Sequence, residues 1–264
     1  MQQQQLQEYK KWFDDFVAGF YGDDEYVNAN IRLKEEHTAK VCEEIKYLAG
    51  EIRLGSDDTM LAECIALFHD VGRFPQFVKY RTYNDTRSES HSALALDVIK
   101  KQKLLEPLPP DEAHVIRKAI AFHGVKDLPE GLDDRTLLFC RLIRDADKLD
   151  IFRVVVDYYA RQAADPDHFT LEMEFPNDPW YSTEVLDAVM RAENVDYRML
   201  KTWNDAKILQ MGWVYDMNFA ASIKRVKERR YIEKIAAFLP DNDQIRRLTQ
   251  KIREYLDHRT APEK

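Results

Sequence analysis

Glycine is scarce in this sequence, and its scarcity argues against the β-rich fold classes. Only 8 of the 264 residues are glycine. Sandwiches and barrels contain many tight turns, and such turns use glycine heavily. Apolar residues instead recur at spacings of three and four along nearly the whole chain, which is the period of an amphipathic helix. The sequence therefore predicts an all-α fold.

Cysteine, long apolar runs and excess positive charge are also scarce, and each absence excludes a class of protein. The three cysteines, Cys42, Cys64 and Cys140, are far apart and lie in helical patterns, which indicates buried thiols rather than disulfides. No segment approaches about 18 uncharged apolar residues, and the N-terminus lacks a signal-peptide core. A net charge of −8 disfavours nucleic-acid and anionic-membrane binding. We expect a cytoplasmic protein without a membrane partner.

The spacing of apolar residues, and of the Gly, Pro, Asp and Asn that form loops, predicts the helix boundaries. We expect helices at about 5–20, 27–53, 57–71, 88–103, 110–123, 134–162, 181–193, 197–221, 222–238 and 241–258. One segment, 169–175, alternates like a strand but predicts at most a short hairpin arm. A stretch rich in Pro and Asp, 164–179, contains no flexible Gly/Ser linker. The sequence therefore predicts one compact unit over residues 1–264, with a helical extension at 180–258.

Histidines occupy the most informative positions, because four of them lie on the apolar faces of successive predicted helices. Steps of three or four residues lead from each to the apolar positions of its own helix. They are His37, His69, His91 and His123. Asp147 lies four residues from both Ile143 and Ile151 in a fifth helix. Asp70 directly follows His69. We expect all these ionisable side chains to point inward.

A core histidine that donates to a backbone carbonyl would explain any one of these positions alone. That explanation weakens for the whole set, because burying a polar group costs several kcal/mol unless the group is satisfied. A divalent metal satisfies neutral imidazoles and ionised carboxylates together. The other histidines, His114, His168 and His258, lack the inward pattern. The set predicts a metal site between the helices of a bundle.

In this order, the residues resemble the HD superfamily of metal-dependent phosphohydrolases. The His…His-Asp…Asp motif of that superfamily matches four residues: His37, His69, Asp70 and Asp147. The segment DADKLD (145–150) is similar to the motif that closes the family pattern. His91 and His123 resemble the two further ligands found in those HD proteins that hold two metals. The segments around these histidines resemble a group of bacterial HD proteins whose substrate is not settled. The resemblance covers about residues 30–155 and implies an HD metal-binding core at 27–160, in a helical bundle with additional C-terminal helices.

The resemblance implies two divalent metals as cofactors. The first would be held by His37, His69, Asp70 and Asp147. The second would be held by His91 and His123, with Asp70 bridging. Such a pair directs a bridging hydroxide at phosphorus. Histidine-rich ligation suits Fe, Mn, Zn, Ni or Co better than Mg, and the choice among them stays open. The implied function is hydrolysis of a phosphate mono- or diester of a nucleotide or another small phosphorylated metabolite.

Cations near the metals would bind the substrate phosphate. Arg73 occupies a position where Lys or Arg is common in the family, and we expect it to act in catalysis with Asp70. Lys148 follows Asp147 and is similar to a phosphate-binding lysine of nucleotide-hydrolysing relatives, so we expect it both to bind substrate and to act in catalysis. Further substrate contacts are expected from Lys34, Lys79 and Arg81. For each cation the alternative is a solvated surface charge.

Four further features have less specific patterns. Asp150 would either orient a ligand histidine or bind a substrate ribose. Asp145 is expected at the surface. The basic run 224–230 indicates a solvated helix face rather than a nucleic-acid site. The aromatic-rich segment 203–215 indicates core packing.

Two alternatives to hydrolysis stay open on the same residues. Some HD proteins with this six-ligand set hold a mixed-valent di-iron centre and use oxygen to cleave C–C or C–P bonds. Others are non-catalytic modules that bind a nucleotide as a signal, although a complete ligand set argues against that role. The oligomeric state is not indicated.

Overall fold

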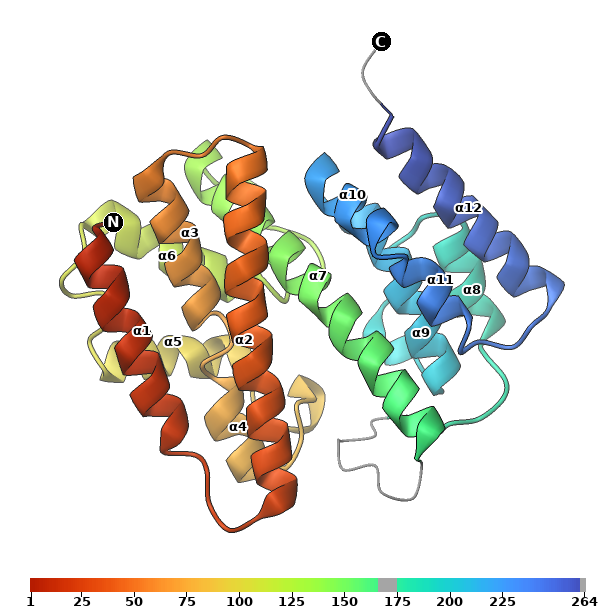
Figure 1. Cartoon of the computed structure of the whole chain (residues 1–264), viewed down its shortest axis with the longest axis horizontal. Coiled ribbons are helices and arrows are strands. Elements are labelled where there is room, and N and C mark those ends of the chain that lie inside the picture. The colour runs from red at the N-terminus through yellow and green to blue at the C-terminus, as the bar shows by residue number, and fades with distance from the viewer. Residues whose placement is uncertain (166–174, 262–264) are drawn as a thin grey trace. The chain divides into compact units, whose positions relative to one another are not determined.

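The computed structural model describes residues 1–165 and 175–261, and this part of the chain is built from helices (Figure 1). No strand occurs in the described ranges, so the predicted all-α fold is confirmed. The strand-like segment 169–175 lies outside the described residues, except for its last position. Within those same ranges, no helix is both long enough and apolar enough to cross a membrane.

The chain divides into two compact units, one from Met1 to Asp150 and one from Ile151 onward. The boundary falls inside one long helix, α7 (Asp134–Ala164). Because the helix continues across the boundary, neither a loop nor a change in composition marks it in the sequence. The two units follow the expected core at 27–160 and extension at 180–258 only approximately. Their assembly into one body stays a prediction.

The first unit contains the helices that carry the inward histidines. Its elements are α1 (Gln3–Ala18), α2 (Glu25–Glu51), α3 (Ser56–Phe68), α4 (Arg73–Tyr80), the 3-10 turn η1 (Asp85–Arg87), α5 (His91–Lys101), α6 (Pro110–Phe122) and the first part of α7. Asp24 caps α2 by accepting a hydrogen bond from the Val27 amide at 3.1 Å. Ile45, Leu61 and Ile116 come from three different helices and are fully buried. Each such side chain contributes about 1.5–3 kcal/mol of hydrophobic stabilisation.

The spacing of apolar residues did not predict α4. Helix α3 ends at Phe68 rather than at position 71, and α4 begins directly after Gly72. A Cβ atom at Gly72 would lie 2.2 Å from the carbonyl oxygen of His91 and 2.5 Å from the amide nitrogen of Ala95. Only glycine therefore lets this turn pack against the start of α5. Eight residues after such a turn are too few for a helical period to be recognised.

The second unit contains the rest of α7 and a set of shorter helices. They are α8 (Thr183–Met190), η2 (Tyr197–Met199), α9 (Trp203–Gly212), η3 (Trp213–Asp216), α10 (Ala220–Glu228), α11 (Tyr231–Ala236) and α12 (Asp243–Arg259). The continuous helices predicted at 197–221 and 222–238 are wrong. The first is interrupted because Thr202 and Asp205 form a capping box that begins α9. The second is interrupted at Arg230, whose φ of 55° lies in the left-handed region.

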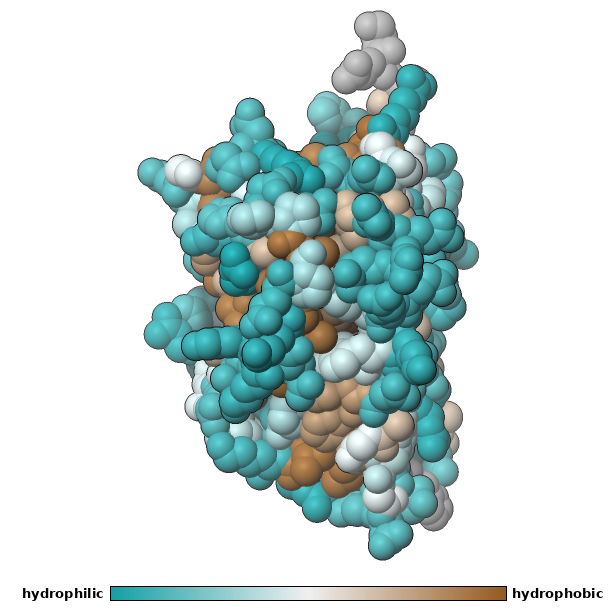
Figure 2. All heavy atoms as spheres, turned by 90° about the vertical axis from the view of Figure 1, so that its left-hand side faces the viewer, coloured by the Kyte–Doolittle hydropathy of each residue, from teal (hydrophilic) through white to brown (hydrophobic). Residues whose placement is uncertain are grey.

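Charged and polar side chains cover most of the face drawn in Figure 2, and apolar residues reach the surface there in smaller areas. This surface agrees with a charged fraction of 33% in the sequence. In the first unit, Tyr26 and Val78 are large apolar side chains that are exposed. Scattered apolar exposure of this kind is ordinary for a folded protein.

Candidate metal centre

The four inward histidines of the sequence analysis lie at the ends of helices or within one, and all are buried. They are His37 within α2, His69 just after α3, His91 at the start of α5 and His123 just after α6. His114 and His258 are exposed, and His168 lies outside the described residues. The spacing of apolar residues thus separated the buried histidines from the exposed ones.

Asp70 lies among these histidines, and its two carboxylate oxygens face different pairs. Oδ2 lies 3.7 Å from Nε2 of His37 and 3.7 Å from Nε2 of His69. Oδ1 lies 3.7 Å from Nε2 of His123 and 4.0 Å from Nε2 of His91. We call His37 and His69 the first pair, and His91 and His123 the second pair. Asp70 is therefore placed between the two pairs.

Asp147 reaches the first pair from α7. Its Oδ1 lies 3.1 Å from Nε2 of His37 and 3.7 Å from Nε2 of His69. Among the described residues, three overlapping groups have ligand atoms within 4.8 Å of one another. They are His37 with His69 and Asp70, His69 with His123 and Asp147, and Asp70 with His91 and His123. The structure thus brings together all six side chains that the resemblance implies as ligands.

Backbone carbonyls orient one histidine of each pair. Nδ1 of His69 lies 2.7 Å from the carbonyl oxygen of Ala66. Nδ1 of His123 lies 2.7 Å from the carbonyl oxygen of Ile120. A carbonyl oxygen only accepts, so Nδ1 carries the proton and donates in both rings. Nε2 of each ring then presents its lone pair to the centre.

Carboxylates orient the other histidine of each pair. Nδ1 of His37 donates to Oδ2 of Asp150 at 2.7 Å. Nδ1 of His91 donates to Oδ2 of Asp85 at 2.6 Å. Hydrogen bonds of this kind fix the tautomer and the orientation of metal-binding histidines. All four rings are therefore held with Nε2 facing inward.

Two of the inward nitrogens face each other and the other two lack a hydrogen-bond partner, and this indicates a place for a cation. Nε2 of His91 and Nε2 of His123 lie 2.9 Å apart, although both present lone pairs. Nε2 of His37 and of His69 are buried without a hydrogen-bond partner among the described residues. Facing lone pairs repel unless a positive charge lies beside them. A divalent metal that accepts imidazole nitrogen and carboxylate oxygen fits these atoms.

The two central carboxylates are held in the ionised form that binds metals. Burial raises the pKa of Asp70, but nearby positive groups, with Lys34 foremost, outweigh it and hold the pKa well below its usual range. Burial also raises the pKa of Asp147, but the adjacent His37 and His69 bring that pKa well below its usual range. Both carboxylates can therefore act as ligands without first losing a proton.

Two of the predicted substrate-binding cations contact Asp70, one at each oxygen. Nζ of Lys34 donates to Oδ2 at 2.8 Å, and Nε of Arg73 lies 3.4 Å from Oδ1. The ring of Tyr83 lies beside both cations, with its centroid 5.3 Å from Nζ of Lys34 and 5.8 Å from Cζ of Arg73. Nη1 of Arg73 also donates to the Tyr83 carbonyl oxygen at 2.5 Å. Lys34 and Arg73 thus lie at the centre, as expected.

The structure does not bring Lys79 and Arg81 together with the centre. Both are exposed, and each pairs with an acidic side chain. Nζ of Lys79 lies 2.7 Å from Glu89, and Nη1 of Arg81 lies 2.7 Å from Asp24. The structure therefore does not place these two side chains as the expected substrate contacts. Lys148 is half-buried in α7.

The structure buries both Asp150 and Asp145. Asp150 is 2% exposed, and its carboxylate accepts a hydrogen bond from Nδ1 of His37, as expected of a residue that orients this histidine. The expected surface position of Asp145 is wrong, since its exposure is 0%. All residues from 142 to 146 are buried, so this stretch of α7 has no solvated face.

Some residues that support the centre were not predicted from the sequence. Besides His91, Asp85 accepts hydrogen bonds through Oδ1 from Nη1 of Arg73 at 3.1 Å and from Nε2 of Gln76 at 2.9 Å. Arg144 is buried and donates to carbonyl oxygens at the end of α6, including that of His123 at 3.3 Å. Asp85 lies in a segment without periodicity, and an acid shortly before a ligand histidine is the only signal that could have indicated it. Arg144 has no local signal.

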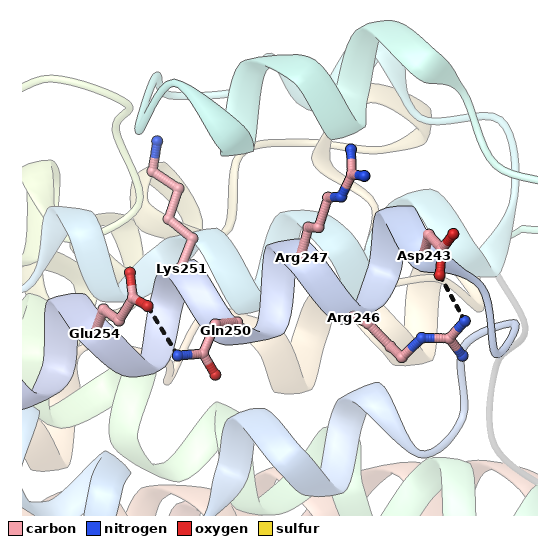
Figure 3. A pocket seen from close by; sticks show the side chains of 6 residues that line it. All are labelled: Asp243, Arg246, Arg247, Gln250, Lys251 and Glu254. Carbon is pink, nitrogen blue, oxygen red and sulfur yellow. Dashed lines mark hydrogen bonds and ion pairs between the residues drawn. The ribbon is translucent and has the colours of Figure 1, made fainter.

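A surface hollow in the second unit is lined by α12 (Figure 3). Its lining residues are Asp243, Arg246, Arg247, Gln250, Lys251 and Glu254. Arg246 pairs with Asp243 at 2.8 Å, and Gln250 donates to Glu254 at 2.8 Å. No histidine or cysteine lies among the lining residues, so the hollow offers no counterpart to the metal centre.

Comparison with known proteins agrees with the class that the centre indicates, an all-α domain with a cluster of histidines and aspartates that could hold a metal ion. Residues 35–151 match the family model of the HD domain. The match is consistent with an HD domain in this part of the chain. HD domains bind divalent metals and are commonly metal-dependent phosphohydrolases. No curated protein and no solved structure matches the chain.

Proposed function

We propose that this protein is a metal-dependent phosphohydrolase that cleaves a phosphate ester of a nucleotide or of another small phosphorylated metabolite. The position of Asp70 between the two pairs carries the proposal. One of its carboxylate oxygens faces the first pair at 3.7 Å, and the other faces the second pair at 3.7 and 4.0 Å. A carboxylate in this position can serve two divalent ions at once.

The six ligand side chains divide into two sets that share Asp70. The first metal would be held by His37, His69, Asp70 and Asp147. The second metal would be held by His91, His123 and Asp70. When bound, two such metals lower the pKa of a water molecule and stabilise negative charge on phosphoryl oxygens. Imidazole-rich ligation suits Mn, Fe, Co, Ni or Zn.

The chain's own cations support an anionic substrate. Lys34 and Arg73 contact opposite oxygens of Asp70 and are each only partly exposed. Phosphoryl transfer needs cations on the non-bridging oxygens as charge develops there. Lys148 is a further candidate for phosphate binding, by resemblance to nucleotide-hydrolysing relatives.

The test is release of inorganic phosphate from a panel of nucleotides and sugar phosphates by Mn²⁺-loaded protein, with oxygen and without it. We expect turnover under both conditions. His69→Ala should reduce turnover by at least about 100-fold, because it removes a ligand of the first metal. His114→Ala changes an exposed histidine of the same unit and should retain activity.

Two results would overturn the proposal. Turnover that requires both iron and oxygen would identify an oxygenase instead. Nucleotide binding without turnover, unchanged when the metals are removed, would identify a sensing module.

A further inference from the structure

Asp85 accepts hydrogen bonds from more side chains than a residue that only orients a histidine would. Its Oδ2 accepts the hydrogen bond from Nδ1 of His91 at 2.6 Å. Its Oδ1 accepts from Nη1 of Arg73 at 3.1 Å and from Nε2 of Gln76 at 2.9 Å. One carboxylate therefore holds both a histidine of the second pair and a cation placed for substrate.

These contacts close into a circuit around the second pair. Nε of Arg73 lies 3.4 Å from Oδ1 of Asp70. The same oxygen lies 4.0 Å from Nε2 of His91. The circuit therefore runs through His91, Asp85, Arg73 and Asp70. A displacement of Asp85 would move groups on two sides of the second metal position.

The segment that carries Asp85 is held in place by Gln76. Gln76 is fully buried in α4. Besides Asp85, its Nε2 donates to Oγ of Ser88 and to the carbonyl oxygen of Glu89, each at 2.9 Å. Its Oε1 accepts from Nη1 of Arg73 at 2.9 Å. The position of Asp85 is therefore built by α4 and does not depend on a bound ion.

We propose that Asp85 is a positioning residue for the second metal, orienting His91 through Nδ1 and Arg73 through Nη1. It sets the affinity of the second metal and leaves the first metal unaffected. The inference rests on the two-metal site of the proposed function. Asparagine cannot replace Asp85, because its amide nitrogen would face a donor, either His91 on one side or Arg73 and Gln76 on the other.

The experiment titrates metal-free protein with Mn²⁺ and follows binding by calorimetry, elemental analysis and electron paramagnetic resonance. The wild type should bind two ions per chain and show the spectrum of a coupled pair. Asp85→Asn should bind the first ion as the wild type does and the second about 10- to 100-fold more weakly. Glu89→Gln, the control, changes an exposed acid of the same segment that pairs with Lys79. It should behave as the wild type.

Inorganic phosphate then tests the second contact of Asp85. At Mn²⁺ concentrations that fill both positions, we expect Asp85→Asn to bind phosphate roughly tenfold more weakly, because Nη1 of Arg73 loses the acceptor that positions its guanidinium group. Unchanged phosphate binding would refute the role toward Arg73. Unchanged binding of the second ion, or loss of both ions, would refute the inference and leave the proposed function standing. A wild type that binds fewer than two ions would refute the two-metal site itself.

Discussion

The two histidine pairs of the metal centre differ in what holds them. In the first pair, His37 is backed by Asp150, which is 2% exposed and lies on the long helix α7. In the second pair, His91 is backed by Asp85, whose side chain is 35% exposed and lies on a short turn. A long helix therefore fixes His37, whereas His91 depends on a contact from a short turn.

The two pairs also differ in their electrostatic surroundings. Burial and then Lys34 lower the pKa of His37, but two neighbouring aspartates outweigh them and leave that pKa raised. Burial and then Arg73 lower the pKa of His91 to about 4. Each pair thus lies between carboxylates and a cation, but two central carboxylates, Asp70 and Asp147, face the first pair and only Asp70 faces the second. We expect a divalent ion to bind the first pair more tightly.

Asp70→Asn should have the largest effect, because it removes the carboxylate that both pairs share. We expect purified protein to lose both ions and phosphohydrolase activity to fall roughly 1,000-fold. Elemental analysis and the phosphate-release assay measure the two effects. Asp14→Asn, an exposed substitution in α1, is the matched control. Retention of two ions by Asp70→Asn would contradict the bridging role.

Asp150→Asn tests what the carboxylate behind His37 contributes to the first pair. It places a neutral amide opposite Nδ1 of His37 in a buried position. We expect the first ion to bind about 10- to 100-fold more weakly, with the second ion unchanged. The unfolding free energy of the metal-free protein should fall by about 1–3 kcal/mol in chemical denaturation. Weaker binding of the second ion would show that the pairs are not independent.

Metal removal tests the expected difference in affinity between the pairs. An ion that binds only the folded state adds about 2.7 kcal/mol of stability when its concentration is 100 times its dissociation constant. The melting temperature of metal-free protein should therefore rise in two steps as Mn²⁺ is added. Differential scanning calorimetry follows both steps. One single step would mean that the two positions have equal affinity.

Lys79→Ala should have the smallest effect, because Lys79 is exposed and pairs with Glu89 outside the centre. We expect the KM and kcat for a phosphate ester to stay within about twofold of the wild type. Steady-state kinetics measure both constants. A large rise in KM with kcat unchanged would show that Lys79 contacts the substrate.

The histidines of the cluster could be predicted because each lies on the apolar stripe of its own helix. A step of four residues connects His69 to Ile65, and this local spacing already places the ring inward. Asp70 directly follows His69 in the sequence, so the prediction for His69 also places Asp70 at the centre. Local periodicity and the motif order were therefore sufficient for the six side chains at the centre.

The partners behind the ligands could not be predicted, because they depend on contacts between distant elements. Asp85 reaches His91 from a segment without periodicity, and Arg144 in α7 donates to the end of α6. Asp145 was expected at the surface but is buried, because α7 is buried on more than one face at this point. The helix interruption at Arg230 depends on one left-handed residue, which no spacing of apolar residues reveals.

The bridging role of Asp70 is tested most directly by anomalous diffraction from crystals of the Mn²⁺-loaded protein. We predict two anomalous peaks about 3.5–4 Å apart, one beside each oxygen of Asp70. One peak should lie against Nε2 of His37 and His69, and the other against Nε2 of His91 and His123. A single peak, or a pair of peaks away from Asp70, would contradict the two-metal centre.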